Sequence, residues 1–389
     1  MGRYRILTLD GGGSWALIEA MTLIDIFGEK ETGHGVLKQF DMVASNSGGS
    51  IVLGGLVEDM TLAQIRDVFL SEASRKSVFA RKTLHLPGLE KYETPKKLDG
   101  LRAAFPRHGD KPLPEAAADI PGHSGKPVHL LVISFNYDTN RGVFFRSAVA
   151  SRKGWGTGAV GTATVAEAIH ASSNAPIRYF DGPAKLPSQT GKRYWDGAIS
   201  GGNNPVLMAV SEAIVLGQDP KNIAALSLGT GATSLPFGPG DGTESPIFQT
   251  IHQSGLTTDL EKIAGAILDD PPDVATFMAH VMTGGPPAGF EHPVDSSIVR
   301  LNPMIAPVLD ESGKFVLPEG LDADAFESLV KLDLDAVDQS QVEEIEHFAN
   351  IWLNGFVANQ PVRVGSDLTP EIGQARYADA KQAWKELTA

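Results

Sequence analysis

The residues around Ser47 are of the types that a nucleophile in acyl transfer requires. The stretch Ser45-Asn46-Ser47-Gly48-Gly49 follows a short, largely apolar segment, residues 40–44, and precedes another apolar segment, residues 51–56. A serine on a sharp strand-to-helix turn exposes its hydroxyl at the helix end where free backbone N–H groups favour negative charge. This is the nucleophile elbow, usually written G-x-S-x-G, with Ser45 here in place of the first glycine. A Ser/Gly-rich turn without chemistry explains the stretch equally well when it is considered alone.

A second turn has the composition of an anion site. Gly11-Gly12-Gly13 follows an apolar run that ends at Asp10 and precedes a predicted helix over residues 15–27. The backbone N–H groups of such a turn can bind an oxyanion or a phosphate. A dinucleotide fold also fits G-x-G-x-x-A, but it needs an acidic residue at the end of the second strand, and Asp41 stands at the beginning. Asp10 would also repel a pyrophosphate.

An actin-like sugar or acetate kinase is the other phosphate-binding alternative. Asp10-Gly11-Gly12-Gly13-Ser14 and Leu228-Gly229-Thr230-Gly231 superficially resemble the two phosphate-binding loops of that fold. This interpretation leaves the turns at Ser47 and Asp196 unexplained. The remaining interpretation is an oxyanion hole for acyl transfer.

Acyl transfer by Ser47 needs a base, and Asp196 is the best-placed candidate. It lies between a predicted strand and a turn, and Gly197 and Ala198 leave room for close approach. A carboxylate can take a serine proton directly when it is within hydrogen-bond reach and partly desolvated. Taken alone, Asp196 is more simply an Asx-turn residue. The histidines after it in the chain (His252, His280 and His292) have no signature around them and are expected to be surface or packed residues.

The elements that must position these residues alternate along the chain. Residues 128–135 form the most apolar predicted strand, residues 142–146 a hairpin-like return, and residues 223–228 a further buried strand. Strands in continuous apolar runs, alternating with helices, predict an α/β fold with a mainly parallel sheet that is covered on both faces.

Two regions depart from this alternation. Residues 81–127 contain many prolines and no clean periodicity, which predicts an irregular insertion that is a surface loop or a lid. We place a catalytic core at residues 1–235 and a mostly helical extension, packed on the core, at residues 236–389.

Composition narrows the possible functions. The chain has 389 residues, 42% of them apolar, and a net charge of −14, which argues against nucleic acid as the main partner. Since the chain has no cysteine, it forms no disulfide, thiolate metal site or cysteine nucleophile. No signal-peptide pattern and no apolar run of roughly 18 residues occurs, so we expect a cytoplasmic protein whose membrane contact is peripheral. Nothing in the sequence indicates an oligomeric state.

Several motifs together, in this order, resemble the patatin-like phospholipases, over roughly residues 4 to 235. They are Asp10-Gly11-Gly12-Gly13, Ser45-Asn46-Ser47-Gly48-Gly49, Ala171-Ser172-Ser173-Asn174-Ala175-Pro176, Asp196-Gly197-Ala198 and, more weakly, Leu226-Ser227-Leu228-Gly229-Thr230-Gly231. The resemblance implies an α/β/α sandwich and a lipid acyl hydrolase that needs no cofactor or metal. It implies that Ser47 is the nucleophile, that Asp196 is the base, and that Gly11, Gly12 and Gly13 form the oxyanion hole.

The sequence departs from the family pattern at two places. Trp15 and Ala16 stand where the family usually has arginine and glycine, and Ser45 replaces the first glycine of the elbow. Both the nucleophile and the base are nevertheless present. A catalytically weak or inactive lipid-binding protein on the same scaffold is the alternative to an esterase.

Overall fold

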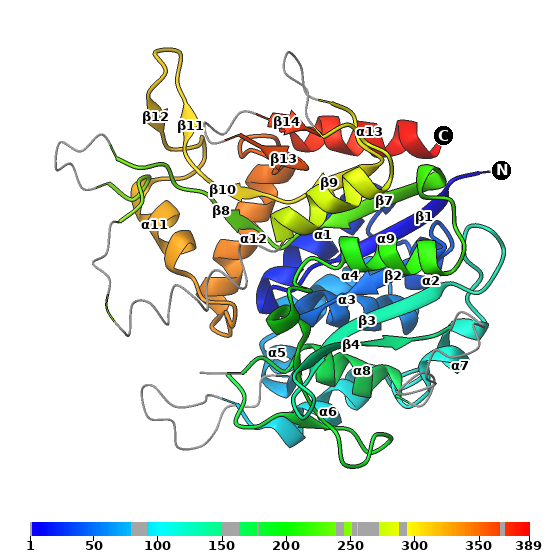
Figure 1. Cartoon of the computed structure of the whole chain (residues 1–389). Helices are drawn as coiled ribbons and strands as arrows, with labels where there is room; N and C mark the ends of the chain where they lie inside the picture. Colours follow the sequence, from blue (N-terminus) through cyan, green and yellow to red (C-terminus); the bar gives the residue numbers. More distant parts are fainter. Residues whose placement is uncertain are drawn as a thin grey trace.

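The chain folds around one large sheet between two helical layers (Figure 1). The computed structural model describes residues 2–78, 92–148, 163–176, 179–238, 245–250, 255, 272–287, 294–365 and 370–389. The strands of the eight-stranded sheet are β1 (Tyr4–Leu9), β2 (Met42–Ser45), β3 (His129–Asn136), β4 (Arg141–Arg146), β5 (Ala184–Lys185), β6 (Arg193–Asp196), β7 (Ile223–Leu228) and β9 (Ile298–Leu301). Their order is β5-β6-β3-β2-β1-β7-β9, and β4 also pairs with β3.

The sheet is mainly parallel, as predicted. Strands β3, β2, β1, β7 and β9 run parallel to one another, whereas β4 and β6 pair with β3 in the antiparallel sense. The predicted hairpin return of residues 142–146 is confirmed by the antiparallel register of β4 with β3.

Side chains that alternate along the strands enter two separate cores. Leu7 and Val43 pack into one core with helices on the first face, while Ile6 and Met42 pack into a second core with α9 and the helix over residues 272–282. Alternation of this kind buries both faces of the sheet and confirms the predicted α/β/α sandwich. The helices are α1 (Leu17–Phe27), α2 (Gly33–Leu37), α3 (Ser47–Val57), α4 (Leu62–Leu70), α5 (Glu72–Val78), α6 (Thr94–Ala104), α7 (Leu113–Ala118), α8 (Val165–Ser172), α9 (Val206–Val215), α11 (Ala323–Lys331), α12 (Gln339–Leu353) and α13 (Tyr377–Thr388).

One edge of β3 brings two other strands end to end. Because β4 occupies the opposite edge from Leu131 to Asn136, β2, which pairs with residues up to Val132, and β6, which pairs from Ser134 onward, share this edge. Ser45 is the partner of Val132, and Asp196 is the partner of Ser134. Since residues two apart on a strand are separated by roughly 7 Å, the ends of β2 and β6 must meet.

The C-terminal third shares the sheet and the core with the rest of the chain. Strand β9 extends the sheet beyond β7, and Phe348 of α12 and Trp384 of α13 belong to the same core as α1 and α3. The smaller two-stranded sheets pair β10 (Met304–Ile305) with β8 (Ala232–Thr233), β11 (Val308–Leu309) with β12 (Phe315–Val316), and β13 (Arg363–Val364) with β14 (Pro370–Ile372). The division at residue 235 stays a prediction, and residues on both sides of it form one sheet.

The expectation of an irregular insertion over residues 81–127 is wrong for its second part, which contains α6 and α7. Pro95 and Pro114 look like helix breakers in the sequence, but each lies in the first turn of its helix. Proline is tolerated there because those N–H groups have no intrahelical acceptor. Residues 79–91 lie outside the described residues, so the lid stays a prediction.

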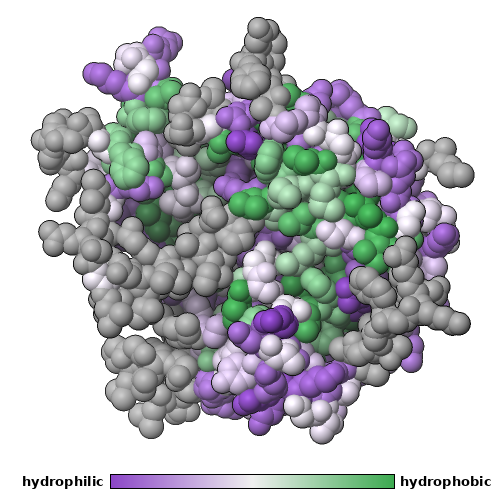
Figure 2. Space-filling model, viewed as in Figure 1, coloured by the Kyte–Doolittle hydropathy of each residue, from purple (hydrophilic) through white to green (hydrophobic). Residues whose placement is uncertain are grey.

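An apolar surface covers the face that carries α9 and the 272–282 helix (Figure 2). Val274, Met278 and Val281 are exposed on this helix at helical spacing. No described helix is both long enough and apolar enough to span a bilayer.

Candidate active site

Ser47 lies on a strained turn between β2 and α3. Asn46 is the N-cap of α3 in an extended conformation, and Ser47, the first residue of the helix, has a φ of 47°. A positive φ is costly for a residue with a side chain and marks a turn that its surroundings hold in place. Ser45 is still within β2, so a side chain at this position is accommodated.

The glycines after Ser47 let the elbow approach the glycine loop. A Cβ on Gly48 would lie 2.4 Å from the carbonyl oxygen of Gly13, and one on Gly49 would lie 2.5 Å from that of Asp10. The amide of Gly49 also donates to the Asp10 carbonyl at 3.0 Å. The elbow and the loop are therefore packed backbone against backbone, which no larger residue allows.

Asp196 ends β6 and faces the elbow. Its Oδ1 accepts hydrogen bonds from the Ala198 amide at 2.9 Å and from Asn46 Nδ2 at 3.1 Å. Burial raises the pKa of this carboxyl above its usual range, while the Ala198 amide, the Ser47 side chain and Asn46 oppose the rise. The structure thus brings Ser47 and Asp196 together, with the carboxylate only 4% exposed. This is the environment of a general base that acts directly on a serine.

The segment after α8 supports both of these residues. The Ser47 amide donates to Ser172 Oγ at 3.0 Å. The Asp196 amide donates to the Asn174 carbonyl, also at 3.0 Å. Ser172 Oγ in turn donates to Asn46 Oδ1 at 3.4 Å. One short segment therefore sets the positions of Ser47 and Asp196 relative to each other.

The glycine loop offers free backbone donors, although Gly11 is not one of them. The Gly11 amide donates to the Asn203 carbonyl at 2.8 Å, so the prediction that it binds an oxyanion needs correction. The amides of Gly12, Gly13 and Gly48 have no acceptor within the described part of the chain. These three groups are the candidates for an oxyanion hole.

A buried ion pair lies beneath the glycine loop. Arg300 Nη2 of β9 contacts Asp10 Oδ2 at 2.6 Å, and both side chains are almost fully buried. Burial raises the pKa of Asp10 to about 6, although Arg300 favours its ionised form. Burial likewise raises the pKa of Glu19 well above its usual range, with Asp10 contributing.

Ser47, Asp196 and the glycine loop line a cavity of about 1060 Å³. Asp10, the glycine loop, Ser47 and Asp196 form its polar floor, and Arg300 and Lys97 also border it. The apolar wall consists of Ile51, Ile199, Met304, Ile305, Leu329, Val330, Leu332 and Leu334. Polar groups around Ser47 beside apolar side chains of this kind are suited to a ligand that has both a polar group and an apolar chain.

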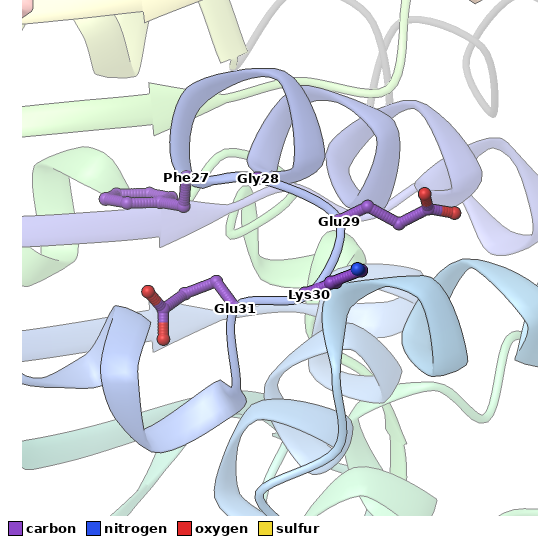
Figure 3. Close-up of a pocket in the computed structure, with 5 residues that line it drawn as sticks. All are labelled: Phe27, Gly28, Glu29, Lys30 and Glu31. Atoms are coloured by element: carbon purple, nitrogen blue, oxygen red, sulfur yellow. The ribbon is translucent and has the colours of Figure 1, made fainter.

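A second depression lies elsewhere and contains no comparable chemistry. It is formed by the turn after α1, from Phe27 to Glu31, and Figure 3 shows Glu29 and Glu31 pointing away from each other there. Glu29 forms an ion pair with Arg66 at 3.0 Å.

No histidine of the described part of the chain lines the cavity that contains Ser47. His280 is fully buried with Nδ1 near Ser296 Oγ at 2.7 Å and Nε2 near the Pro286 carbonyl at 2.8 Å. His252 and His292 lie outside the described residues. Among the residues that the structure describes, no three His, Cys, Asp or Glu side chains are grouped as metal ligands.

Sequence reasoning missed five residues of this site: Asn46, Ser172, Asn174, Lys97 and Arg300. The first three lie inside motifs that the sequence singled out, but nothing in the motifs indicates which backbone group each would bind. Lys97 and Arg300 stand in regions where no pattern pointed to chemistry.

Comparison with known proteins gives a family match over the site. The family described as patatin-like phospholipase matches residues 7–210, more than half of the chain and a range that includes Ser47 and Asp196. No curated protein matches. Among solved structures, the crystal structure of VipD from Legionella pneumophila is similar at 10% identity, with 90% of this chain and 67% of that chain covered and a TM-score of 0.36.

Proposed function

The chain belongs to the patatin-like phospholipase family, and we propose that it hydrolyses fatty-acyl esters of lipids through an acyl-enzyme on Ser47. The observation that carries the proposal is the meeting of Ser47 with the buried Asp196 carboxylate beneath free amides of the glycine loop. Family membership supports a lipid acyl hydrolase, and the roles of individual residues are our inference.

Acylation would begin with attack of Ser47 Oγ on the ester carbonyl carbon. The hydroxyl proton passes to Asp196, and the negative charge moves to the carbonyl oxygen, where the amides of Gly12, Gly13 and Gly48 can donate to it. When the bond to the alcohol breaks, Asp196 returns the proton to the leaving oxygen. The fatty-acyl group then remains on Ser47 as an ester.

Deacylation repeats these steps with water as the nucleophile. Asp196 takes a proton from the water, whose oxygen attacks the acyl carbon, and the same amides face the oxyanion. The proton then returns to Ser47 Oγ as the fatty acid leaves. We assign the proton transfer to Asp196 without a histidine, because Asp196 lies beside Ser47 and burial, which raises the pKa of its carboxyl, favours uptake of a proton.

The apolar wall of the cavity supports a fatty-acyl substrate. Met304 of β10, Leu329 near the end of α11 and Leu332 just after it line the cavity that also contains Ser47. Burial of an acyl chain there contributes roughly 0.8 kcal/mol per CH₂ group. Peripheral contact with a lipid surface and a cytoplasmic location remain predictions.

Hydrolysis of p-nitrophenyl esters of graded chain length tests the proposal. We expect the wild type to release p-nitrophenol with a preference for longer chains, and Ser47→Ala to lose this activity. A fluorophosphonate probe should label the wild type once and leave Ser47→Ala unlabelled. Equal rates in the two proteins would refute the proposal, and binding of a fatty acid without turnover or labelling would favour a non-catalytic lipid-binding protein.

A further inference from the structure

Lys97 of α6 is a buried lysine at the edge of the active-site cavity. Its side chain is fully buried and borders the same cavity as Ser47 and Asp196. The ammonium donates to the Ser173 carbonyl and lies 4.3 Å from the centre of the Phe180 ring. Ser173 is near the C-terminal end of α8, where carbonyl groups favour a cation.

This ammonium has no ion-pair partner within salt-bridge distance in the part of the chain that the structure describes. The other cation at the cavity, Arg300, is paired with Asp10 at 2.6 Å. Burial of an unpaired charge is costly, so a fold keeps one only where other groups stabilise it. When Lys97 is protonated, its charge is therefore stabilised by the Ser173 carbonyl and not offset by a carboxylate in contact with it.

The carboxylate that interacts electrostatically with Lys97 is that of Asp196. Lys97 binds the carbonyl of Ser173, and the next residue, Asn174, accepts the Asp196 amide. The Lys97 ammonium and the Asp196 backbone thus bind neighbouring carbonyls of one short segment, and both side chains border the same cavity. Attraction between them lowers the pKa of Asp196, against the larger effect of burial. Burial lowers the pKa of Lys97 to about 7, and Asp196 opposes that shift.

Other ionisable groups near α6 are neutral or already engaged. His170 of α8 is buried, and burial together with Lys97 keeps its pKa well below the usual range, so it is uncharged. Asp181 accepts from the Thr94 amide at 3.1 Å, and Arg102 of the same helix binds Asp110 at 2.8 Å. Asp335, across the cavity, accepts from the Tyr92 hydroxyl at 2.6 Å.

We propose that Lys97 is a positioning residue whose ammonium stabilises the ionised form of Asp196 and holds the Ser173–Asn174 segment that supports it. The proposal rests on the proposed function, because it concerns the base of that reaction. Lys97 acts through Asp196 and needs no contact with the substrate. Its loss should therefore change the pH range of the enzyme even for a substrate without charge.

The test compares the acid limb of kcat/KM for a neutral p-nitrophenyl ester in wild type, Lys97→Met and Lys97→Arg. Methionine keeps most of the volume and removes the charge, whereas arginine keeps the charge. We expect the limb of Lys97→Met to move up by about 1 pH unit, the low end of the effect of a close opposite charge. The acid limb of Lys97→Arg should lie within about a quarter of a pH unit of the wild-type limb. Coincident limbs in wild type and Lys97→Met, or equal shifts in both variants, would overturn the proposal.

A reciprocal measurement needs no substitution at Lys97 and no turnover. The titration of Lys97, followed by NMR with labelled lysine side chains, should lie near pH 7 in the wild type and at lower pH in Asp196→Asn. The direction follows because the asparagine no longer attracts the ammonium. An unchanged titration would contradict the coupling. If the wild type shows no turnover beyond Ser47→Ala, the proposed function fails, while this measurement still decides whether Lys97 and Asp196 interact.

Discussion

Replacing Ser172 by alanine should cost activity far more than stability. Ser172 Oγ is the acceptor for the Ser47 amide at 3.0 Å, and its side chain is fully buried. Ser172→Ala leaves that amide without an acceptor, at a cost of about 1–3 kcal/mol. The bond also holds Ser47 at a φ of 47°, a conformation that itself costs on the order of 1–3 kcal/mol. The elbow can therefore relax when the acceptor is lost.

This relaxation sets the expected size of the effect. If the productive conformation becomes less favourable by about 1.4–2.8 kcal/mol, kcat/KM falls by about 10- to 100-fold. The assay is kcat/KM for a p-nitrophenyl ester, with the melting temperature from circular dichroism beside it. In a chain of this size, the same free energy should lower the melting temperature by only a few degrees.

The neighbouring serine provides a matched control. Ser173 Oγ donates back to the Ile169 carbonyl at 2.6 Å, within the turn that ends α8, and forms no hydrogen bond with the elbow among the described residues. Ser173→Ala keeps the backbone carbonyl that binds Lys97. We therefore expect kcat/KM within about threefold of the wild type, which corresponds to about 0.6 kcal/mol in activation free energy. A Ser172→Ala enzyme with wild-type activity, or equal losses in the two variants, would refute this account of the elbow.

Three further substitutions test the rest of the site. Asp196→Asn should lower kcat/KM by about 10²–10⁴-fold and leave the melting temperature unchanged or raised, because burial disfavours the charge; a fall in stability with activity retained would contradict the role of base. Arg300→Met should lower the free energy of unfolding in urea by about 3 kcal/mol, because it leaves the buried Asp10 charge without a partner, and adding Asp10→Asn should recover part of the loss. A loss below about 1 kcal/mol would show that Asp10 does not depend on Arg300 for compensation of its charge. Gly13→Ala places a Cβ 2.3 Å from the Leu334 carbonyl oxygen at a φ of 57°, so kcat/KM should fall by at least about tenfold, whereas Gly182→Ala, with no atom within 4 Å of the new Cβ, should match the wild type.

The parts of the site that could be predicted from the sequence are those formed by short stretches of consecutive residues. The elbow at Ser47 and the turn at Asp196 each combine an apolar strand with small residues, and both lie where such patterns place them. The sandwich was also predictable, because apolar runs alternating with helices leave few other arrangements.

What could not be predicted depends on contacts between distant segments. Nothing in residues 193–196 indicates that β6 pairs antiparallel to β3, end to end with β2, yet this pairing brings Asp196 to Ser47. The occupation of the Gly11 amide by Asn203 is likewise a tertiary contact. Lys97 stood in a proline-rich stretch, where prolines that begin helices are easily mistaken for breaks.

The glycine loop, where the sequence departs from the family pattern, is held in place by contacts from the C-terminal third of the chain. Residues well beyond the family match reach this loop: Arg300 binds Asp10, and the Leu334 carbonyl accepts the Ser14 amide at 2.9 Å. Trp15, where the family usually has arginine, donates through Nε1 to the Asp333 carbonyl at 3.3 Å. The loop thus gains its supports from β9 and from the segment between α11 and α12. Leu332 and Leu334 of the same segment also line the cavity that contains Ser47, so this part of the chain both supports the loop and contributes to the apolar lining.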